Sequence, residues 1–234
     1  MANRPVFIVN CDNTESVNYL TKDVDFKWHP GYAIVQKRKS IYSLHENANP
    51  DGALKILEVS SKSESALGIW LSAFNLKVHV KGYGNIPLEC AYQGAKVFEF
   101  GGPYIDLFER SPFKIKKDER LRGSGVIKSF EFNGKSFENI PTTYFYNWLY
   151  INALHENSKF SKEVLQFDTF TDIEFNPKRS KNCQAKACAL YVSLVKKGIL
   201  NDCLRNKEKF KKIMKSVEGV DTSGVLNAQF SLGF

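Results

Sequence analysis

Three polar side chains stand at helical spacing in the segment LECAYQGAKVFEFGG, residues 88–102. If residues 88–99 form a helix, Glu89, Gln93 and Lys96 occupy positions i, i+4 and i+7 and share one face. A carboxylic acid in such a place can serve as general acid or base, and a lysine whose pKa is lowered by burial can serve as a nucleophile. The opposite face is apolar, so an ordinary solvated helix face is the competing interpretation.

A second polar stretch, EVSSKSESALGIWLSAFNL at residues 58–76, lies where a predicted strand ends. Its candidate binding or catalytic side chains are Ser60, Lys62, Ser72, Phe74 and Asn75. Runs of serine and asparagine are also typical of turns, so local turn chemistry is the alternative interpretation.

A third polar stretch, FDTFTDIEFNPKRSKNCQA at residues 167–185, precedes a predicted helix. Asp172 and Glu174 come before this helix, and Ser180 or Asn182 is expected to be its N-cap. Acids near a helix N-terminus often act as caps or dipole partners, whereas a free N-terminus is also suited to bind phosphate.

Composition is that of a soluble globular protein, with 43% hydrophobic and 25% charged residues in a chain of 234. No apolar run approaches the ~20 residues of a membrane span, and the run PVFIV is too short for a signal-peptide core. We therefore expect a cytoplasmic protein with no membrane partner. The five cysteines and four histidines show no metal-ligand spacing, so neither a metal nor a cofactor is expected and most thiols should be buried.

The net charge of +8 and the pI near 9.1 indicate a polyanionic partner. The excess is concentrated in four segments, residues 36–40, 114–122, 177–181 and 205–215. Each can also be a solubilising surface. The residues expected to contact nucleic acid are Lys37, Arg38, Lys114, Lys116 and Lys117.

The pattern of elements predicts one α+β domain over residues 1–234, with a strand-rich N-terminal half, a helical core and a basic C-terminal extension at 205–234. Strands are predicted at 4–10, 31–39, 53–63 and 76–82, and a hairpin at 125–138 with Asn133-Gly134 at its tip. Helices are predicted at 88–99, 141–157, 180–198 and 205–215. In the second of these helices, Trp148 and its aromatic neighbours Tyr144, Phe145 and Tyr146 are expected to pack in the core.

The segments LSAFNL and ECAYQGAKVF, followed by a late D-x-E…N-x-x-A, resemble the signatures of the NADAR family, the YbiA-like domains associated with NAD and ADP-ribose. The segments KRKSIYSLHE, KDERLRGSG and TTYFYNWLYINAL make the chain most similar to the branch associated with DarT-type DNA ADP-ribosyltransferase toxins. The resemblance covers about residues 25–200, and the E-x-x-Y-Q-x-x-K segment is its most specific part.

The resemblance implies an antitoxin that hydrolyses the N-glycosidic bond between ADP-ribose and guanine bases of DNA, reversing the partner toxin. It implies catalytic roles for Glu89, Lys62 or Lys96, and Asp172. Glu89 would protonate the leaving amine or the ring oxygen and then serve as base for water, or a lysine would instead trap the opened sugar as a Schiff base. The implied ligand-binding residues are Ser60, Ser72, Phe74, Asn75, Tyr92, Gln93, Glu174 and Asn182.

The sequence departs from the family pattern at three places. Cys90 stands where the family commonly has histidine, Ile173-Glu174 replaces a Trp-Gly pair, and Cys183-Gln184-Ala185 replaces the usual residues after Asn182. We therefore expect a pocket suited to a different leaving group from that of the riboflavin-pathway members.

Two other functions fit the same residues. One is an N-glycosidase acting on a small riboflavin-pathway-like molecule, and the other is a non-catalytic module that binds ADP-ribose or the toxin. The expected partners are ADP-ribosylated DNA, ADP-ribose and a DarT-type toxin, and the expected oligomeric state is a monomer.

Overall fold

The computed structural model describes residues 1–9 and 19–218, and these form two compact units. The first unit contains the described residues of Met1–Ser72 together with Leu154–Lys178 and Cys183–Asn201. The second contains Ala73–Ala153, Arg179–Asn182 and the described residues from Asp202 onward. The single-domain boundaries 1–234 stay a prediction, and the part of the basic extension at 219–234 lies outside the described residues.

The first unit is built on a four-stranded sheet with the order β2-β1-β9-β3. Strands β1 (Ala2–Val9) and β2 (Tyr19–Phe26) are antiparallel, β9 (Thr169–Thr171) runs antiparallel to β1, and β3 (Ile56–Glu58) runs parallel to β9. Successive side chains Val6 and Phe7 of β1 are both buried, which requires cover on both faces of the sheet.

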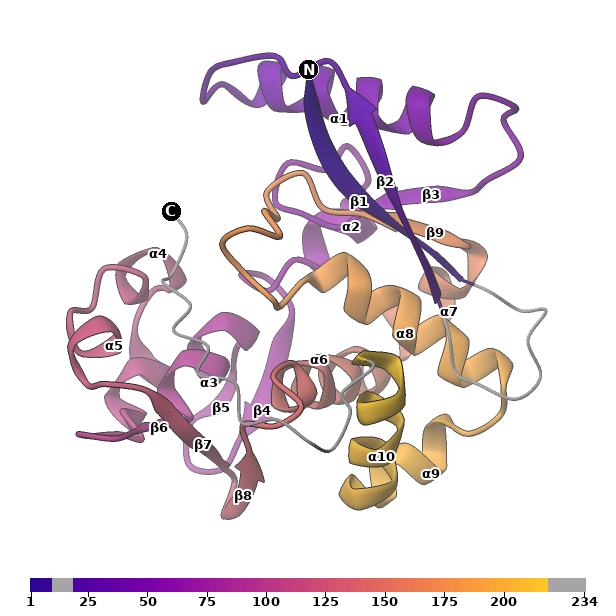
Figure 1. Cartoon of the computed structure of the whole chain (residues 1–234). Helices are drawn as coiled ribbons and strands as arrows, with labels where there is room; N and C mark the ends of the chain where they lie inside the picture. Colours follow the sequence, from indigo (N-terminus) through magenta and orange to yellow (C-terminus); the bar gives the residue numbers. More distant parts are fainter. Residues whose placement is uncertain (10–18, 219–234) are drawn as a thin grey trace. The chain divides into compact units, whose positions relative to one another are not determined.

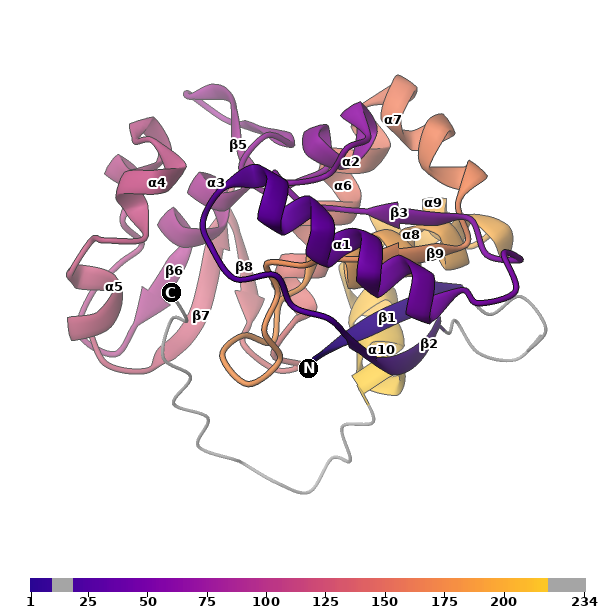
Figure 2. The ribbon, with the colours of Figure 1, turned by 90° about the horizontal axis from the view of Figure 1, so that it is seen from above.

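Two helices supply that cover. Helix α1 (Ile34–Ala48) contacts β2, helix α8 (Gln184–Lys196) contacts β1 and β9, and the two helices lie on opposite faces of the sheet (Figures 1 and 2). The α1 side of the sheet has a continuous core formed by Val6, Val24, Phe26, Ile41, Leu44, Ala48 and Ile173. The unit also contains α2 (Ala66–Trp70), α7 (Ser158–Glu163) and the 3-10 helix η2 (Val164–Gln166).

The second unit contains two small antiparallel sheets. Strands β4 (Lys77–Val80) and β5 (Gly84–Pro87) form a hairpin, and β6 (Lys96–Phe98), β7 (Ile127–Phe132) and β8 (Lys135–Glu138) form a three-stranded sheet. The short elements of the unit are α3 (Leu88–Gly94), η1 (Ile105–Glu109), α4 (Pro112–Ile115) and α5 (Arg120–Gly123).

Longer helices complete the chain. Helix α6 (Tyr144–Glu156) begins in the second unit, α9 (Leu200–Arg205) links the two units along the chain, and α10 (Lys207–Glu218) belongs to the second unit. Tyr144, Phe145 and Tyr146 of α6 are buried in the core as predicted, with Phe145 stacked on Phe130 at 4.6 Å between ring centroids, whereas Trp148 is half-buried against Phe137. None of the helices in the described part of the chain is long and apolar enough to cross a membrane.

The α+β class with strands in the N-terminal half is confirmed, and so is the 125–138 hairpin. Asn133 and Gly134 both have positive φ, 48° and 73°, which is what a two-residue turn of this kind requires. The helices predicted at 141–157, 180–198 and 205–215 are also present.

The strand predicted at 31–39 is wrong, because α1 begins at Ile34. The β-branched residues at its start favour a strand locally, but Ile41, Leu44 and Ala48 recur at helical spacing and are buried on the sheet. Tertiary packing therefore overrides the local preference.

The helix predicted at 88–99 ends at Gly94, so its last part is wrong, and Lys96 begins strand β6 instead. A side chain at Gly94 would place its Cβ 2.5 Å from the Phe108 ring, which explains why glycine stands where the helix meets η1. Lys96 pairs with Phe130 of β7.

Candidate active site

The predicted site residues divide between the two units. The first unit contains Lys37, Arg38, Ser60, Lys62, Ser72, Asp172 and Glu174. The second contains Phe74, Asn75, Glu89, Tyr92, Gln93, Lys96, Lys114, Lys116, Lys117 and Asn182.

Glu89 lies in the first turn of α3, a helix in which every residue is buried. Its backbone amide donates to the carbonyl of Ala73 at 2.9 Å, which joins the LSAFN segment to the start of α3. Its side-chain Oε1 accepts a 2.9 Å bond from Gln93 Nε2. Glu89 as a whole is only 8% exposed, so the solvated helix face considered from the sequence is not what forms.

Lys96 is buried although it is a lysine, with 4% exposure. Its Nζ lies 4.9 Å from the centroid of the Tyr92 ring. Burial lowers the pKa of Lys96 to about 8, and the Glu89 carboxyl group acts in the opposite direction. A lysine with this pKa supplies a substantial fraction of neutral amine near physiological pH, which a nucleophilic lysine needs.

Tyr92 connects this helix to the segment before α8. Asn182 Nδ2 donates a 2.7 Å hydrogen bond to Tyr92 Oη, and the Tyr92 ring stacks on Phe130 at 5.6 Å. Burial raises the pKa of Tyr92, so its hydroxyl group stays neutral and can donate a hydrogen bond at physiological pH.

Two buried amide oxygens in the second unit have no hydrogen-bond partner among the described residues. They are Gln93 Oε1 and Asn182 Oδ1. Gln93 uses its NH₂ group to donate to Glu89 Oε1, so its own Oε1 is the atom left to accept from another group. Buried acceptors are normally paired. These two are therefore suited to receive hydrogen bonds from the hydroxyl or amine groups of a ligand.

The N-cap expected for α8 is wrong. The helix begins at Gln184 with Cys183 at the N-cap, and Cys183 makes no capping bond. Asn182 uses its side-chain amide for Tyr92 instead, and Ser180 Oγ donates to the Asn182 carbonyl at 3.1 Å. The role of Asn182 in holding a diphosphate or ribose stays a prediction.

The first unit contains a buried pair of acids that sequence reasoning only half identified. Glu58, at the end of β3, accepts hydrogen bonds from Thr171 Oγ1 at 2.6 Å and from the Ile173 amide at 2.9 Å. Asp172 Oδ1 accepts from the amides of Glu174 and Phe175 at 3.1 and 3.2 Å. Burial, and then the charge of Glu58, raises the pKa of Asp172 well above its usual value.

Glu58 was missed because its bonding partners are 113 and 115 residues away in the sequence. Its signal is an acid inside the apolar strand ILEV, where a charge must find partners. A chain of hydrogen bonds runs from Glu58 through Thr171 to His45. Because Thr171 Oγ1 donates its proton to Glu58, it accepts a hydrogen bond from His45 Nε2, 2.8 Å away. Burial lowers the pKa of His45 to about 4, so its ring stays neutral.

The serine-rich segment is used largely for local structure. Ser60 Oγ accepts from the Lys62 amide at 3.2 Å, and Ser72 Oγ donates to the Ile69 carbonyl at 2.7 Å. Gly68 lies so close to β3 that an added Cβ would be 2.0 Å from the Glu58 carbonyl oxygen. These contacts support the turn interpretation for the hydroxyl groups, and their ligand-binding role stays a prediction.

The predicted nucleic-acid residues have two different settings. Lys37 Nζ pairs with Glu174 at 3.0 Å and lies 4.8 Å from the Trp28 ring centroid, while Arg38 Nε lies 3.9 Å from Glu64. In the second unit, Lys114, Lys116 and Lys117 are exposed on and after α4. Lys114, Lys116 and Lys117 are better placed to reach a polyanion than Lys37, because the charge of Lys37 is already paired with Glu174.

The cysteines of the described chain, Cys90, Cys183, Cys188 and Cys203, are all buried, whereas Cys11 lies outside the described residues. Cys90 Sγ donates to the Arg110 carbonyl at 3.2 Å. Burial raises the pKa of Cys90 to about 12, so its thiol stays protonated. Within residues 1–9 and 19–218, no cluster of three or more histidine, cysteine or acidic side chains is suited to hold a metal ion.

Fold and site together define an α+β protein that buries an acid, an amide and an amine around one short helix and the strand after it. A family model described as DarT1-associated NADAR antitoxin matches residues 2–223. The chain belongs to this family, which supports an antitoxin role linked to a DarT toxin. NADAR proteins are generally associated with N-glycosidase or hydrolase activity. No curated protein matches the chain.

Proposed function

We propose that this protein hydrolyses the N-glycosidic bond between ADP-ribose and guanine in DNA and thereby reverses a DarT-type toxin. The observation that carries the proposal is the polar set around α3. Glu89 and Lys96 are buried in one unit, and Gln93 binds Glu89 while its own side-chain oxygen has no partner within residues 1–9 and 19–218. Burial of these three polar groups costs folding free energy, and a helix that served only core packing would not require them.

Glu89 is the proposed proton carrier. Its carboxyl group gives a proton to the exocyclic amine of guanine as the bond to ribose C1 breaks, and the resulting carboxylate takes a proton from the water that adds to C1. The unpaired oxygens of Gln93 and Asn182 accept hydrogen bonds from sugar hydroxyl groups. Asp172, whose pKa is raised by burial, is the alternative acid.

Lys96 is the proposed nucleophile in a second route to the same products. Its neutral amine forms a bond to C1 as guanine leaves with a proton, the sugar ring opens to a Schiff base, and water then releases ADP-ribose and restores the amine. The pKa of about 8 favours Lys96 for this role. Lys62 is the other candidate lysine, and its side chain is half-buried at the turn after β3.

The experiment is incubation of the protein with a guanine-ADP-ribosylated oligonucleotide, followed by chromatographic detection of free ADP-ribose. Release of ADP-ribose with regeneration of unmodified guanine is the expected result. Binding without release would make the protein a non-catalytic module. Release from a small nucleoside substrate but not from DNA would favour the small-molecule glycosidase. Borohydride added during turnover should trap a covalent adduct if a lysine forms the Schiff base.

A further inference from the structure

Segment 104–124 of the second unit presents an aromatic side chain to solvent among positive charges. Phe113 on α4 is 72% exposed, and Lys114, Lys116 and Lys117 beside it are exposed as well. Single exposed hydrophobic side chains are common on protein surfaces, so Phe113 is distinguished by the lysines beside it and not by its exposure alone. The charged side chains that follow it directly, on and after α4, are the three lysines, so the partner that matches them chemically is negatively charged and offers flat apolar faces.

Phe113 is held in a fixed orientation by a second ring. Its ring meets that of Phe74 edge to face, at 5.0 Å between centroids and 87° between planes. Lys116 Nζ lies 4.7 Å from the Phe74 centroid. The ring of Phe74 is therefore engaged by Phe113 and by a cation, while most of the surface of Phe113 stays open.

The aromatic pair lies next to the proposed catalytic acid along the backbone. Phe74 directly follows Ala73, whose carbonyl accepts the 2.9 Å hydrogen bond from the Glu89 amide. The segment that carries Phe74 is thus joined to the start of the helix that carries Glu89, so the aromatic pair and the proposed acid belong to adjoining segments of one unit.

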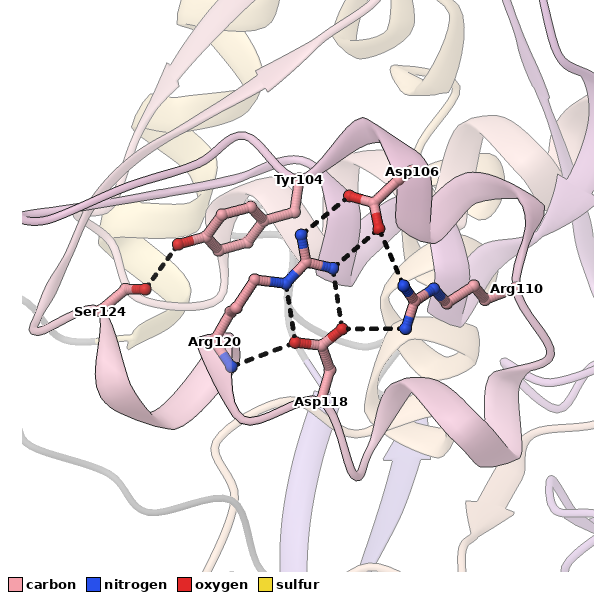
Figure 3. Close-up of polar contacts among 6 residues, drawn as sticks. All are labelled: Tyr104, Asp106, Arg110, Asp118, Arg120 and Ser124. Carbon is pink, nitrogen blue, oxygen red and sulfur yellow. Dashed lines mark hydrogen bonds and ion pairs between the residues drawn. The ribbon is translucent and has the colours of Figure 1, made fainter.

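An ionic network fixes the two ends of the segment that carries Phe113 (Figure 3). Arg120 binds Asp106 through Nη1 and Nη2 at 3.1 and 2.8 Å, and it binds Asp118 through Nε and Nη2 at 2.9 and 2.8 Å. Arg110 pairs with both acids at 3.3 Å. Hydrogen bonds from Arg120 lower the pKa of Asp118 and of Asp106, so the network stays ionised at physiological pH.

The base of the loop is closed further by Tyr104. Arg120 Cζ lies 4.5 Å from the Tyr104 ring centroid, and the Tyr104 hydroxyl group is hydrogen-bonded to Ser124 Oγ at 2.5 Å. Residues 104–110 and 118–124 are thus tied together, and the lysines and Phe113 lie between them. Such preorganisation reduces the ordering cost of binding.

We propose that Phe113 is a stacking platform for a base that neighbours the modified guanine, with Lys114, Lys116 and Lys117 contacting the adjacent phosphates. The proposal rests on the proposed function and adds to it a grip on the strand outside the ADP-ribose. Aromatic side chains stack on any unpaired base, and basic residues around them follow the backbone. The occupant is therefore a DNA strand with an unstacked base. Which of the four bases stacks on Phe113 matters little.

The first test is steady-state hydrolysis of two substrates, an ADP-ribosylated oligonucleotide and ADP-ribosylated deoxyguanosine. Base stacking on an aromatic side chain predicts that Phe113→Ala raises KM for the oligonucleotide by about 5- to 100-fold and leaves kcat unchanged. The nucleoside has no neighbouring base, so its kinetics should not change. Phe113→Trp should behave like the wild type because it retains a stacking face.

Phe100→Ala is the matched control, because Phe100 is 74% exposed in the same unit and lies outside residues 111–117. It should leave both substrates unaffected. An equal effect of Phe113→Ala on both substrates, or an unchanged KM for the oligonucleotide, would overturn the platform. An equal effect of Phe100→Ala would show that exposed aromatic area in general, and not this position, governs binding.

Binding to an unmodified single-stranded oligonucleotide containing 2-aminopurine separates this inference from the proposed function. The wild type should change the 2-aminopurine fluorescence, and Phe113→Ala should bind at least fivefold more weakly, even if the protein hydrolyses neither substrate. Equal binding by both proteins would refute the platform. Weaker binding of Phe113→Ala to a DarT-type toxin, with DNA binding unchanged, would assign the surface to a protein partner and also refute it.

Discussion

Replacing Glu89 with glutamine removes one proton-carrying group while keeping its volume. The new amide oxygen can still accept the hydrogen bond that Gln93 Nε2 donates to Glu89 Oε1 at 2.9 Å, and the backbone bond to Ala73 does not involve the side chain. Folding should therefore change by only about 1 kcal/mol, the usual range for one altered hydrogen bond. Glu131→Gln, an exposed change on β7 of the same unit, is the matched control.

The expected effect on hydrolysis is much larger than the effect on stability. General acid–base catalysis contributes about 10²- to 10⁴-fold, which corresponds to about 3–5 kcal/mol of barrier. Glu89→Gln should lower the single-turnover rate by that factor, with binding of the modified oligonucleotide nearly unchanged. The substitution also removes the carboxylate that raises the pKa of Lys96, so that pKa should fall below about 8.

The assay is single-turnover release of ADP-ribose measured across pH, with binding followed by fluorescence anisotropy. If neutral Lys96 takes part in the reaction, the rate of the wild type should rise with pH through about 8, and in Glu89→Gln this rise should occur at lower pH. A near-wild-type rate for Glu89→Gln would refute the reasoning. Asp172→Asn would then be the next variant to test, because Asp172 is the other buried acid among the predicted site residues.

Three further outcomes are expected. The pKa of Lys96, about 8 instead of 10.5, means that burying its charge costs about 3 kcal/mol below pH 8 and that this cost vanishes as pH rises from 8 to 10.5. The Tm of the wild type should therefore rise relative to the Tm of Lys96→Met as pH increases over this range. A Tm difference between the two proteins that does not change with pH would contradict the burial of an ammonium group. Asn182→Ala should reduce the Tm shift caused by ADP-ribose more than it reduces the Tm itself, whereas a full shift would make Asn182 a purely structural partner of Tyr92. DNA binding by the wild type should weaken about tenfold or more between about 50 and 200 mM salt. Reversing the charges of Lys114, Lys116 and Lys117 should make this salt dependence shallower. An unchanged slope would place the phosphate contacts elsewhere.

Local chemistry explains the parts of the fold that the sequence predicts well. The Asn133-Gly134 turn needs two residues with positive φ, and few residue pairs meet that need as readily. Helix α8 ends where Gly198 adopts a φ of 68° and its amide bonds to the Val195 carbonyl at 2.9 Å. In both places the deciding interactions lie within a few residues of each other.

Distant contacts explain the parts that the sequence predicts wrongly. Nothing near Lys96 shows that it pairs with Phe130, 34 positions later, and so the helical spacing of Glu89, Gln93 and Lys96 suggested one continuous helix. The residues of the polar set were identified although their geometry was not. Glu58 escaped notice for the same reason, since Thr171 and Ile173 are brought to it only by the parallel pairing of β3 with β9.

The polar set around α3 is better explained by ligand binding than by core architecture. A buried hydrogen-bond network that serves only stability should satisfy all its members, because each unpaired acceptor costs about 1–3 kcal/mol. Here Gln93 donates to Glu89 and Asn182 donates to Tyr92, each through its side-chain NH₂ group. The side-chain oxygen of each residue has no hydrogen-bond partner among the described residues. Lys96 adds an amine whose burial lowers its pKa to about 8. In the proposed function, the hydroxyl groups of a ribose supply the missing donors, Glu89 protonates the leaving amine, and water or the neutral amine of Lys96 attacks C1.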